Sequence, residues 1–140
     1  MRFEGDEIIF LLDFYANLYV SIGFGRQMRF SDCVVIAFRG DTAYLTDRHG
    51  IGQVSPIIDS QQDVTLTGYN KLSGTHKLVE FRRKLITNDP CDKQLEIEKG
   101  YYMQYSFHND SKTANIGNDL PEHDDDDAKK FRIYLSMTNL

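Results

Sequence analysis

The sequence predicts an all-β protein, folded as one antiparallel β-sandwich of the immunoglobulin-like type. Apolar and polar residues alternate with a period of two in one segment after another, and no window of a dozen residues follows the 3.6-residue period of a helix. The chain is also rich in aromatic residues, with 8 Tyr and 9 Phe among its 140 residues. That composition favours strands. A chain of this length suits one domain built around one core.

Eight segments carry the strand pattern, and turns separate most of them. Residues 7–14 are apolar and follow a Gly-Asp pair, and residues 18–25 alternate. Residues 32–38 are almost wholly apolar, as expected of a strand covered on both faces. The other five strands are predicted at 42–46, 64–69, 75–85, 101–107 and 131–137, with a turn at 70–74. Two longer connections, 49–62 and 108–130, are candidates for function because long loops in compact domains are usually functional or disordered.

One acidic loop accounts for the net charge of −5. Residues 119–127 carry six acids, and removing these six negative charges from the total leaves +1. The body of the domain then has no basic patch, which argues against nucleic-acid binding. The short basic run at 82–84 is predicted to be a solvated strand face. We expect a single domain over residues 1–140, with an acidic loop at 109–130.

The sequence predicts no membrane span, because the apolar run at 8–12 ends at Asp13. The acidic start of the chain is also unlike a secretory signal. The two cysteines form no CxxC motif, which makes a zinc ribbon an unfavourable interpretation. Cys33 lies in an apolar run and is predicted to be a buried thiol, while a disulfide between Cys33 and Cys91 stays open.

Three motifs, in order, resemble a DOMON domain: "YVSIGFGRQMRFSDCVVI" at 19–36, "YLTDRHGIGQVSPIIDSQQD" at 44–63 and "EFRRKLITNDPCDKQL" at 80–95. The resemblance covers residues 5–107 and, more weakly, the last strand. It is similar to the N-terminal DOMON domain of copper type II, ascorbate-dependent monooxygenases of the dopamine β-monooxygenase type. Two features differ from that pattern. The family has a further strand before Gly5, which we expect to be missing here, and the copper-binding catalytic domains are absent from these 140 residues.

The resemblance implies a small structural cation beside the 49–62 connection. Its matching positions are the carboxylates of Asp32 and Asp63 and the backbone carbonyls of Cys33 and Arg48. Hard cations such as Ca²⁺ bind carboxylate and carbonyl oxygens of this kind. The alternative is that Asp32 and Asp63 cap turns by accepting backbone N–H bonds.

The resemblance also implies a second cofactor, because some DOMON domains bind b-type haem through one Met and one His for electron transfer. Met28 matches the Met, and His123 is the positional candidate for the His, with His108 as the fallback. The sequence around His123, "PEHDDDD", offers no apolar wall for a haem.

The residues themselves suggest two other functions. Asp47 and His49 could act in catalysis, but neighbours in a strand point to opposite faces and no acid–base partner is evident. His49 and His76 are therefore interpreted as surface-loop and strand-edge residues. The tyrosines at 101, 102 and 105 could form a carbohydrate-binding platform, but they are interpreted as core and sheet-face residues.

These observations predict a non-catalytic interaction module with a structural cation at Asp32 and Asp63. The expected partner is a catalytic domain, a second copy of the chain or a larger assembly, because an exposed sheet edge invites pairing with another chain. The resemblance implies an extracellular or secretory-pathway location. The alternatives are a haem electron-transfer domain using Met28 and His123, a carbohydrate-binding module, or one part of a longer gene product that carries the copper domains.

Overall fold

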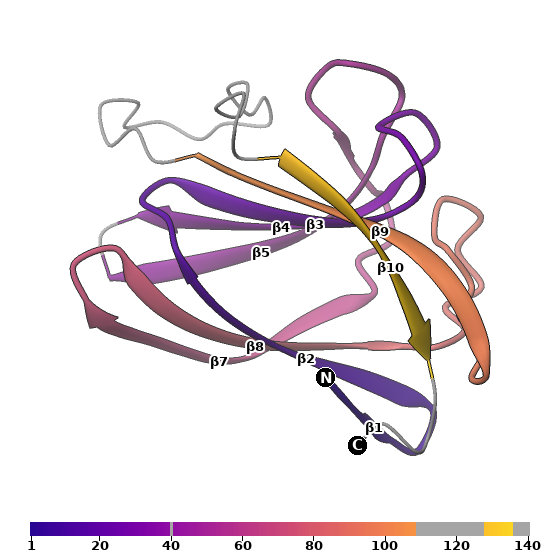
Figure 1. Ribbon diagram of the computed structural model, residues 1–140, viewed down its shortest axis with the longest axis horizontal. Helices are drawn as coiled ribbons and strands as arrows, with labels where there is room; N and C mark the ends of the chain where they lie inside the picture. Colours follow the sequence, from indigo (N-terminus) through magenta and orange to yellow (C-terminus); the bar gives the residue numbers. More distant parts are fainter. Residues whose placement is uncertain (40, 109–127, 136–140) are drawn as a thin grey trace.

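Two antiparallel sheets face each other in this computed structural model, which describes residues 1–39, 41–108 and 128–135 (Figure 1). One sheet has the order β1-β2-β8-β7 and the other β10-β9-β3-β4-β5-β6. The strands are β1 (Arg2–Glu4), β2 (Glu7–Tyr15), β3 (Tyr19–Phe24), β4 (Asp32–Arg39), β5 (Thr42–His49), β6 (Ile57–Ile58), β7 (Val64–Ser73), β8 (His76–Lys84), β9 (Lys99–His108) and β10 (Ala128–Leu135). The predicted sandwich is confirmed, and most of the predicted acidic loop, with His123, lies outside the described residues.

All eight predicted strands are present, with differences in extent. β10, for example, begins at Ala128, inside the predicted acidic loop at 109–130. The short strands β1 and β6 were not predicted, and β1 lies directly before Gly5, where we expected a strand of the family to be missing. β5 continues past Thr46 to His49, where it pairs with Asp32 of β4. The turn predicted at 70–74 is wrong in extent, because β7 continues to Ser73 and pairs with β8 along that length. Its polar residues there lie on an exposed edge strand, so a turn-like composition is compatible with pairing.

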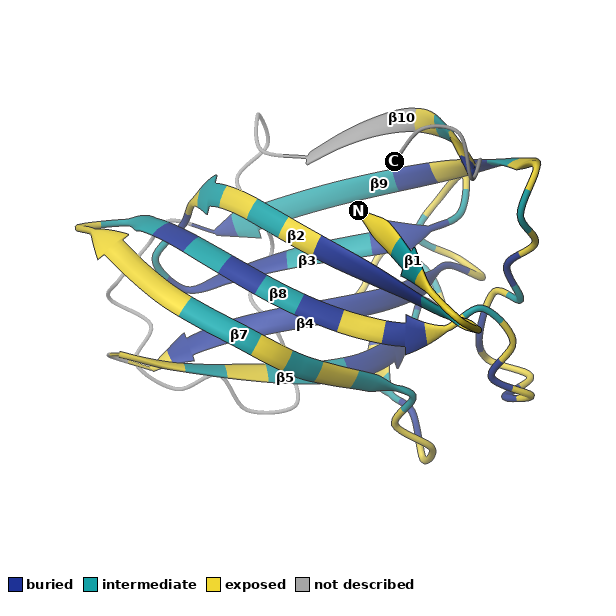
Figure 2. Ribbon diagram, turned by 90° about the horizontal axis from the view of Figure 1, so that it is seen from below, coloured by how far each residue is buried: buried dark blue, intermediate teal, exposed yellow. Residues whose placement is uncertain are grey.

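The core lies between the sheets and follows the period-two pattern (Figure 2). Phe10 of β2 stacks on Phe81 of β8 with ring centroids 4.8 Å apart. β4 is buried from Asp32 to Phe38, as predicted for a strand covered on both faces. Its outward residues Val35 and Ala37 belong to a smaller apolar cluster that also contains Leu18 and Tyr19.

The predicted solvated basic face at 82–84 is wrong at Arg83. Side chains alternate along β8, so Arg83 points to the same face as Val79 and Phe81 and is buried. Lys77 lies on that face too, and its Nζ atom donates to the carbonyl oxygen of Ala16. Arg82, one position from Arg83, is exposed as predicted and pairs with Glu7.

Three connections converge at one end of the sandwich, where they bring distant segments together (Figure 1). They are residues 25–31 between β3 and β4, 50–63 around β6, and 85–98 between β8 and β9. Cys33 is buried as predicted, and both Cys33 and Cys91 are free thiols. The described residues contain no helix that is long and apolar enough to cross a membrane.

Candidate functional site

Three buried carboxylates meet where β4, β5 and the 85–98 connection come together. Asp32 begins β4, Asp47 lies near the end of β5, and the antiparallel register places Asp47 opposite Val34. Asp92 comes from the connection that follows β8. One carboxylate oxygen from each of the three lies within 4.8 Å of the others. Asp32 and Asp47 are only 2% and 1% exposed, so the group is shielded from bulk water.

Arg83 is the cation that faces this cluster. Its Nη1 donates to Oδ2 of Asp32 at 2.6 Å, and the backbone N–H of Lys93 donates to the same oxygen at 2.7 Å. The other end of the guanidinium, Nη2, donates to the carbonyl oxygen of Lys93 at 2.8 Å and lies 3.7 Å from Oδ2 of Asp92. These contacts fasten the 85–98 connection to the start of β4.

The cluster has more carboxylate oxygens than it has donors. Oδ1 of Asp32 and both carboxylate oxygens of Asp92 are buried and have no hydrogen-bond partner in the described part of the chain. Oδ2 of Asp47 accepts from the backbone N–H of Asp63 at 3.0 Å. Three ionised carboxylates against one guanidinium would leave an excess of two negative charges in a buried place, which is costly.

The pKa values of these acids reflect that excess. Burial raises the pKa of Asp47 to about 7, and the charges of Asp92 and Asp32 add to the rise. Burial likewise raises the pKa of Asp92 to about 6, although the nearby Thr87 hydroxyl opposes part of this rise. The pKa of Asp32 is also raised by burial, even though Arg83 lowers it. The excess negative charge of the cluster is therefore neutralised either by bound protons or by a bound cation.

A second group extends the acidic region along the 50–63 connection. Asp59, Asp89 and Asp92 each offer one carboxylate oxygen within 4.8 Å of the others, and all three are buried. Asp92 belongs to both groups, so five buried acids form one continuous region. Sequence reasoning did not single out Asp59, Asp89 or Asp92, although the last two lie in the third motif that carried the family resemblance.

The predicted cation ligands are only partly brought together. Asp32 lies in the cluster, and Cys33 and Arg48 are paired beside it in the β4–β5 ladder. Asp63 contributes its backbone N–H to Asp47, but its carboxylate accepts from Nε2 of Gln61 at 3.0 and 2.8 Å. In the described residues, Asp63 belongs to none of the groups of acidic side chains that lie close enough together to share an ion.

The 50–63 connection is fastened to β5 by a glutamine. Oε1 of Gln62 accepts from the backbone N–H of Asp47 at 2.8 Å, and Nε2 donates to the carbonyl oxygens of Asp47 and Asp59 at 3.0 and 2.9 Å. The interpretation of His49 as a surface-loop residue is wrong, because His49 ends β5 and its Nδ1 contacts Oδ1 of Asp59. Asp59 is the carboxylate partner that the sequence did not reveal.

Met28 lies in the 25–31 connection, half-buried, with its backbone fixed by neighbours. Its carbonyl oxygen accepts from Oγ of Ser31 at 2.7 Å. The fallback haem ligand His108 pairs with Tyr19 at the start of β3, whereas Met28 follows the end of that strand. The strand between them spans about 17 Å, so the described structure does not let Met28 and His108 bind one iron atom.

The three tyrosines do not form one platform. Tyr101 is buried, and its hydroxyl oxygen accepts from the backbone N–H of Glu96 at 2.7 Å. Tyr102 points to the opposite face of β9, where the guanidinium of Arg26 lies 4.4 Å from its ring centroid. Tyr105 instead lines an apolar cleft of about 510 Å³.

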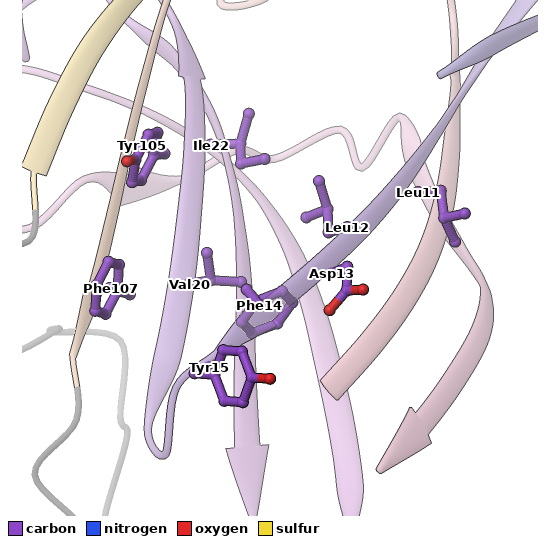
Figure 3. Close-up of a pocket in the computed structure, with 9 residues that line it drawn as sticks. All are labelled: Leu11, Leu12, Asp13, Phe14, Tyr15, Val20, Ile22, Tyr105 and Phe107. Carbon is purple, nitrogen blue, oxygen red and sulfur yellow. The ribbon is translucent and has the colours of Figure 1, made fainter. Parts of the chain in front are cut away.

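This apolar cleft opens between β2 and the β3–β9 pair, beyond the part of β2 that β1 covers. Figure 3 shows Leu12 and Phe14 of β2 facing Val20, Ile22 and Phe107 across it. Met28 is not among the lining residues.

Comparison with known proteins agrees with this fold. The model of the DOMON domain family matches residues 2–108. MOXD1 homolog 2 of Drosophila melanogaster is 33% identical over 102 residues, which make up 71% of this chain and 13% of that protein. DBH-like monooxygenase protein 1 of Mus musculus is 31% identical over 109 residues, 76% of this chain and 18% of that protein. The chain thus spans less than a fifth of the length of these two relatives.

Two solved structures share the fold at low identity. The cytochrome b domain of pyranose dehydrogenase from Coprinopsis cinerea has a TM-score of 0.72 at 19% identity, covering 91% of this chain and 67% of that one. The cytochrome domain of cellobiose dehydrogenase from Myriococcum thermophilum has a TM-score of 0.70 at 18% identity, covering 97% and 70%.

Proposed function

This chain belongs to the DOMON domain family, and we propose that it is a non-catalytic accessory module whose connections are held together by a structural cation, Ca²⁺ or a similar hard ion. The carboxylates of Asp32, Asp47 and Asp92 supply the charged ligands. The backbone carbonyls of Cys33 and Arg48 and the carboxylate of Asp63 are the further ligands that the family resemblance implies.

One observation carries this proposal: the buried cluster of Asp32, Asp47 and Asp92 includes carboxylate oxygens of Asp32 and Asp92 without a hydrogen-bond partner in the described residues, and its only described cationic contact is Arg83. A Ca²⁺ ion takes six to eight oxygen ligands at about 2.3–2.6 Å and tolerates irregular geometry. It would remove the excess negative charge and satisfy those oxygens. Because the ligands come from β4, β5 and the 85–98 connection, a bound ion would join three separate segments.

The test is calcium binding by protein freed of metal with a chelator. We expect binding of about one Ca²⁺ per chain by isothermal titration calorimetry, and a rise in Tm, since a ligand at 100 times its Kd adds about 2.7 kcal/mol to stability. Asp92→Asn should weaken binding at least about tenfold, because it removes a charged ligand. Asp41→Asn, which changes an exposed acid in the β4–β5 hairpin, is the matched control and should bind like the unaltered chain.

Two further results bear on the ligand set. Loss of binding in Asp63→Asn as well as in Asp92→Asn would include Asp63 among the ligands, as the resemblance implies. If neither heat nor a change in Tm accompanies calcium addition, the cluster is balanced by protons alone and the proposal is wrong.

The wider role of the module is proposed from its relatives. Two of these are named as monooxygenases or their homologues, so we propose that the domain docks on a catalytic domain or on another copy of the chain in an extracellular or secretory-pathway compartment. The apolar cleft and the β2 edge beside it offer a surface for such docking.

Haem-mediated electron transfer is the second candidate, favoured by the fold shared with two cytochrome domains. Met28 is in place, but the described histidines do not complete a pair with it: His49 and His76 contact Asp59 and Asp13, and His108 is at the other end of β3. The pair would need His123. An absorption spectrum with a Soret band, lost in Met28→Ala, would favour this candidate over the accessory module.

A further inference from the structure

Next to the acidic cluster, three side chains of different chemistry converge from three segments. His49 is the last residue of β5, Asp59 directly follows β6, and Cys91 lies in the 85–98 connection. One ring nitrogen of His49, one carboxylate oxygen of Asp59 and Sγ of Cys91 all lie within 4.8 Å of one another. This group shares Asp59 with the acidic region but is otherwise separate from Asp32, Asp47 and Asp92.

The group is held in place by its surroundings. Asp59 is 4% exposed, and its backbone N–H donates to the carbonyl oxygen of Asp47 at 3.0 Å. Oδ1 of Asp59 faces Nδ1 of His49, while Oδ2 is buried without a hydrogen-bond partner in the described residues. The backbone N–H of Cys91 donates to Oδ1 of Asp89 at 2.8 Å, which fixes the turn that presents the thiol.

We propose that His49, Asp59 and Cys91 bind a borderline divalent transition metal, with Zn²⁺ as the ion that suits them best. Imidazole nitrogen, carboxylate oxygen and thiolate sulfur are the three ligand types that zinc binds in proteins. Ca²⁺ and Mg²⁺ prefer oxygen ligands alone, so a thiolate and an imidazole select against them. This site therefore takes a different class of ion from the neighbouring carboxylate cluster.

The distances require only a small adjustment. Tetrahedral zinc places a nitrogen and a sulfur ligand about 3.5 Å apart, given bond lengths of about 2.0–2.1 and 2.3 Å. The three atoms are already within 4.8 Å, and Cys91 is exposed, so its side chain is free to rotate towards the other two. Three protein ligands leave a fourth position open, as in zinc sites that bind water or an exogenous ligand.

That fourth position faces an accessible space. His49 and Cys91 both line a cavity of about 420 Å³, together with Arg29, Phe30, Gly50 and Pro90. The cavity brings together the 25–31, 50–63 and 85–98 connections. An ion can therefore enter from solvent without unfolding any strand.

The same three residue types also occur in nucleophilic thiol sites, but the charges here argue against that use. The pKa of Cys91 is raised, first by loss of hydration and then by the carboxylates of Asp59, Asp89 and Asp92. A nucleophilic cysteine requires the opposite, a lowered pKa next to positive charge. A divalent ion would have the opposite effect on the thiol pKa, because it adds positive charge where three carboxylates lie close together.

Cobalt provides the direct test, since Co²⁺ occupies zinc sites and reports its ligands by absorption. In metal-free protein kept reduced, we expect one Co²⁺ to give tetrahedral visible bands and a thiolate-to-metal band in the near ultraviolet, and Zn²⁺ to displace it. Cys91→Ser should abolish the thiolate band, and both Cys91→Ser and His49→Gln should lower zinc affinity at least about tenfold. Excess Ca²⁺ should leave the cobalt spectrum unchanged.

The chain supplies a matched control in a second His–Asp pair. His76 contacts Asp13 on the exposed surface of the other sheet, so His76→Gln should bind zinc like the unaltered chain. A cobalt spectrum without a thiolate band, or equal zinc affinity in Cys91→Ser, would overturn the proposal. Zinc binding lost in Asp92→Asn but kept in His49→Gln would place the ion in the carboxylate cluster instead, which also contradicts it. Failure here leaves the calcium result intact, because the two tests follow different ions and share only the Asp92→Asn variant.

Discussion

Arg83 of β8 and Asp32 of β4 form a buried ion pair between the two sheets, with 2.6 Å between Nη1 and Oδ2. Both side chains are almost completely buried. The pair is oriented by the backbone of Lys93, which donates to Asp32 and accepts from Arg83. It therefore joins β4, β8 and the 85–98 connection at the end of the sandwich that carries the acidic region.

Removing Arg83 should destabilise the fold strongly. In Arg83→Ala the carboxylates of Asp32 and Asp92 lose their cation while staying buried, and breaking a buried pair in this way costs about 3–5 kcal/mol. Urea unfolding followed by tyrosine fluorescence measures the change. Arg82→Ala, an exposed neighbour paired with Glu7, should change the free energy of unfolding by less than about 0.5 kcal/mol. Equal effects of the two variants would show that the buried ion pair contributes no more to stability than the exposed one.

The metal-free domain should lose stability as the pH rises from about 4 to about 7. The pKa values of Asp47 and Asp92 are raised in the folded state to about 7 and about 6, above the 3.8 of an unperturbed Asp. Within that window the folded chain holds protons that the unfolded chain has released, so the free energy of unfolding falls with rising pH. Below pH 4 both carboxyl groups are protonated in the folded and in the unfolded chain, and their contribution to stability is fully present.

We expect a difference on the order of 2 kcal/mol between pH 5 and pH 7.5, measured by urea unfolding in chelator, since one pKa unit is worth about 1.4 kcal/mol. Asp47→Asn should flatten this dependence, because its side chain does not titrate. Saturating Ca²⁺ should reverse the slope by favouring the ionised carboxylates. A metal-free domain that gains stability over the same range would contradict the charge excess in the cluster.

The strands were predictable because period-two alternation is a local property of the sequence. β1 and β6 were not predicted, because strands of three and two residues are too short to show a period. Arg83 was misjudged for a different reason. The alternation that placed Val79 and Phe81 in the core also placed Arg83 there, but charged residues are rarely fully buried unless paired, and the partner lies 51 positions away.

The candidate site was less predictable because its members meet only through tertiary structure. Asp32 was identified from the family resemblance, whereas Asp92 and Asp59 lie in connections whose paths no periodicity describes. The contact between His49 and Asp59 depends on β6, which turns the chain back against β5. Knowledge of the strands alone could not place these side chains together.

Position 50 should accept only glycine. A Cβ atom there would lie 1.7 Å from the carbonyl oxygen of Met28 and 2.5 Å from Oγ of Ser31, and the backbone hydrogen bonds between Gly50 and the 25–31 connection prevent the two from separating. Gly50→Ala should therefore cost about 3 kcal/mol or more, the upper part of the range for overpacking. Gly52→Ala, where nothing lies within 4 Å of the new atom, is the control. Similar Tm values for the two variants would show that the 25–31 connection moves freely.

Gln62 should be the side chain that contributes most to holding the 50–63 connection against β5. Gln62→Ala removes three hydrogen bonds to the backbone of Asp47 and Asp59, for an expected loss of about 1–3 kcal/mol in the free energy of unfolding. Amide hydrogen exchange should speed up in residues 57–63 while β8 stays protected, because the lost bonds are local. Gln53→Ala, an exposed glutamine in the same connection, should leave both measurements unchanged. If exchange in 57–63 is as slow in Gln62→Ala as in the unaltered chain, the ladder between β5 and β6 is enough to hold the connection, and the glutamine is not its fastening.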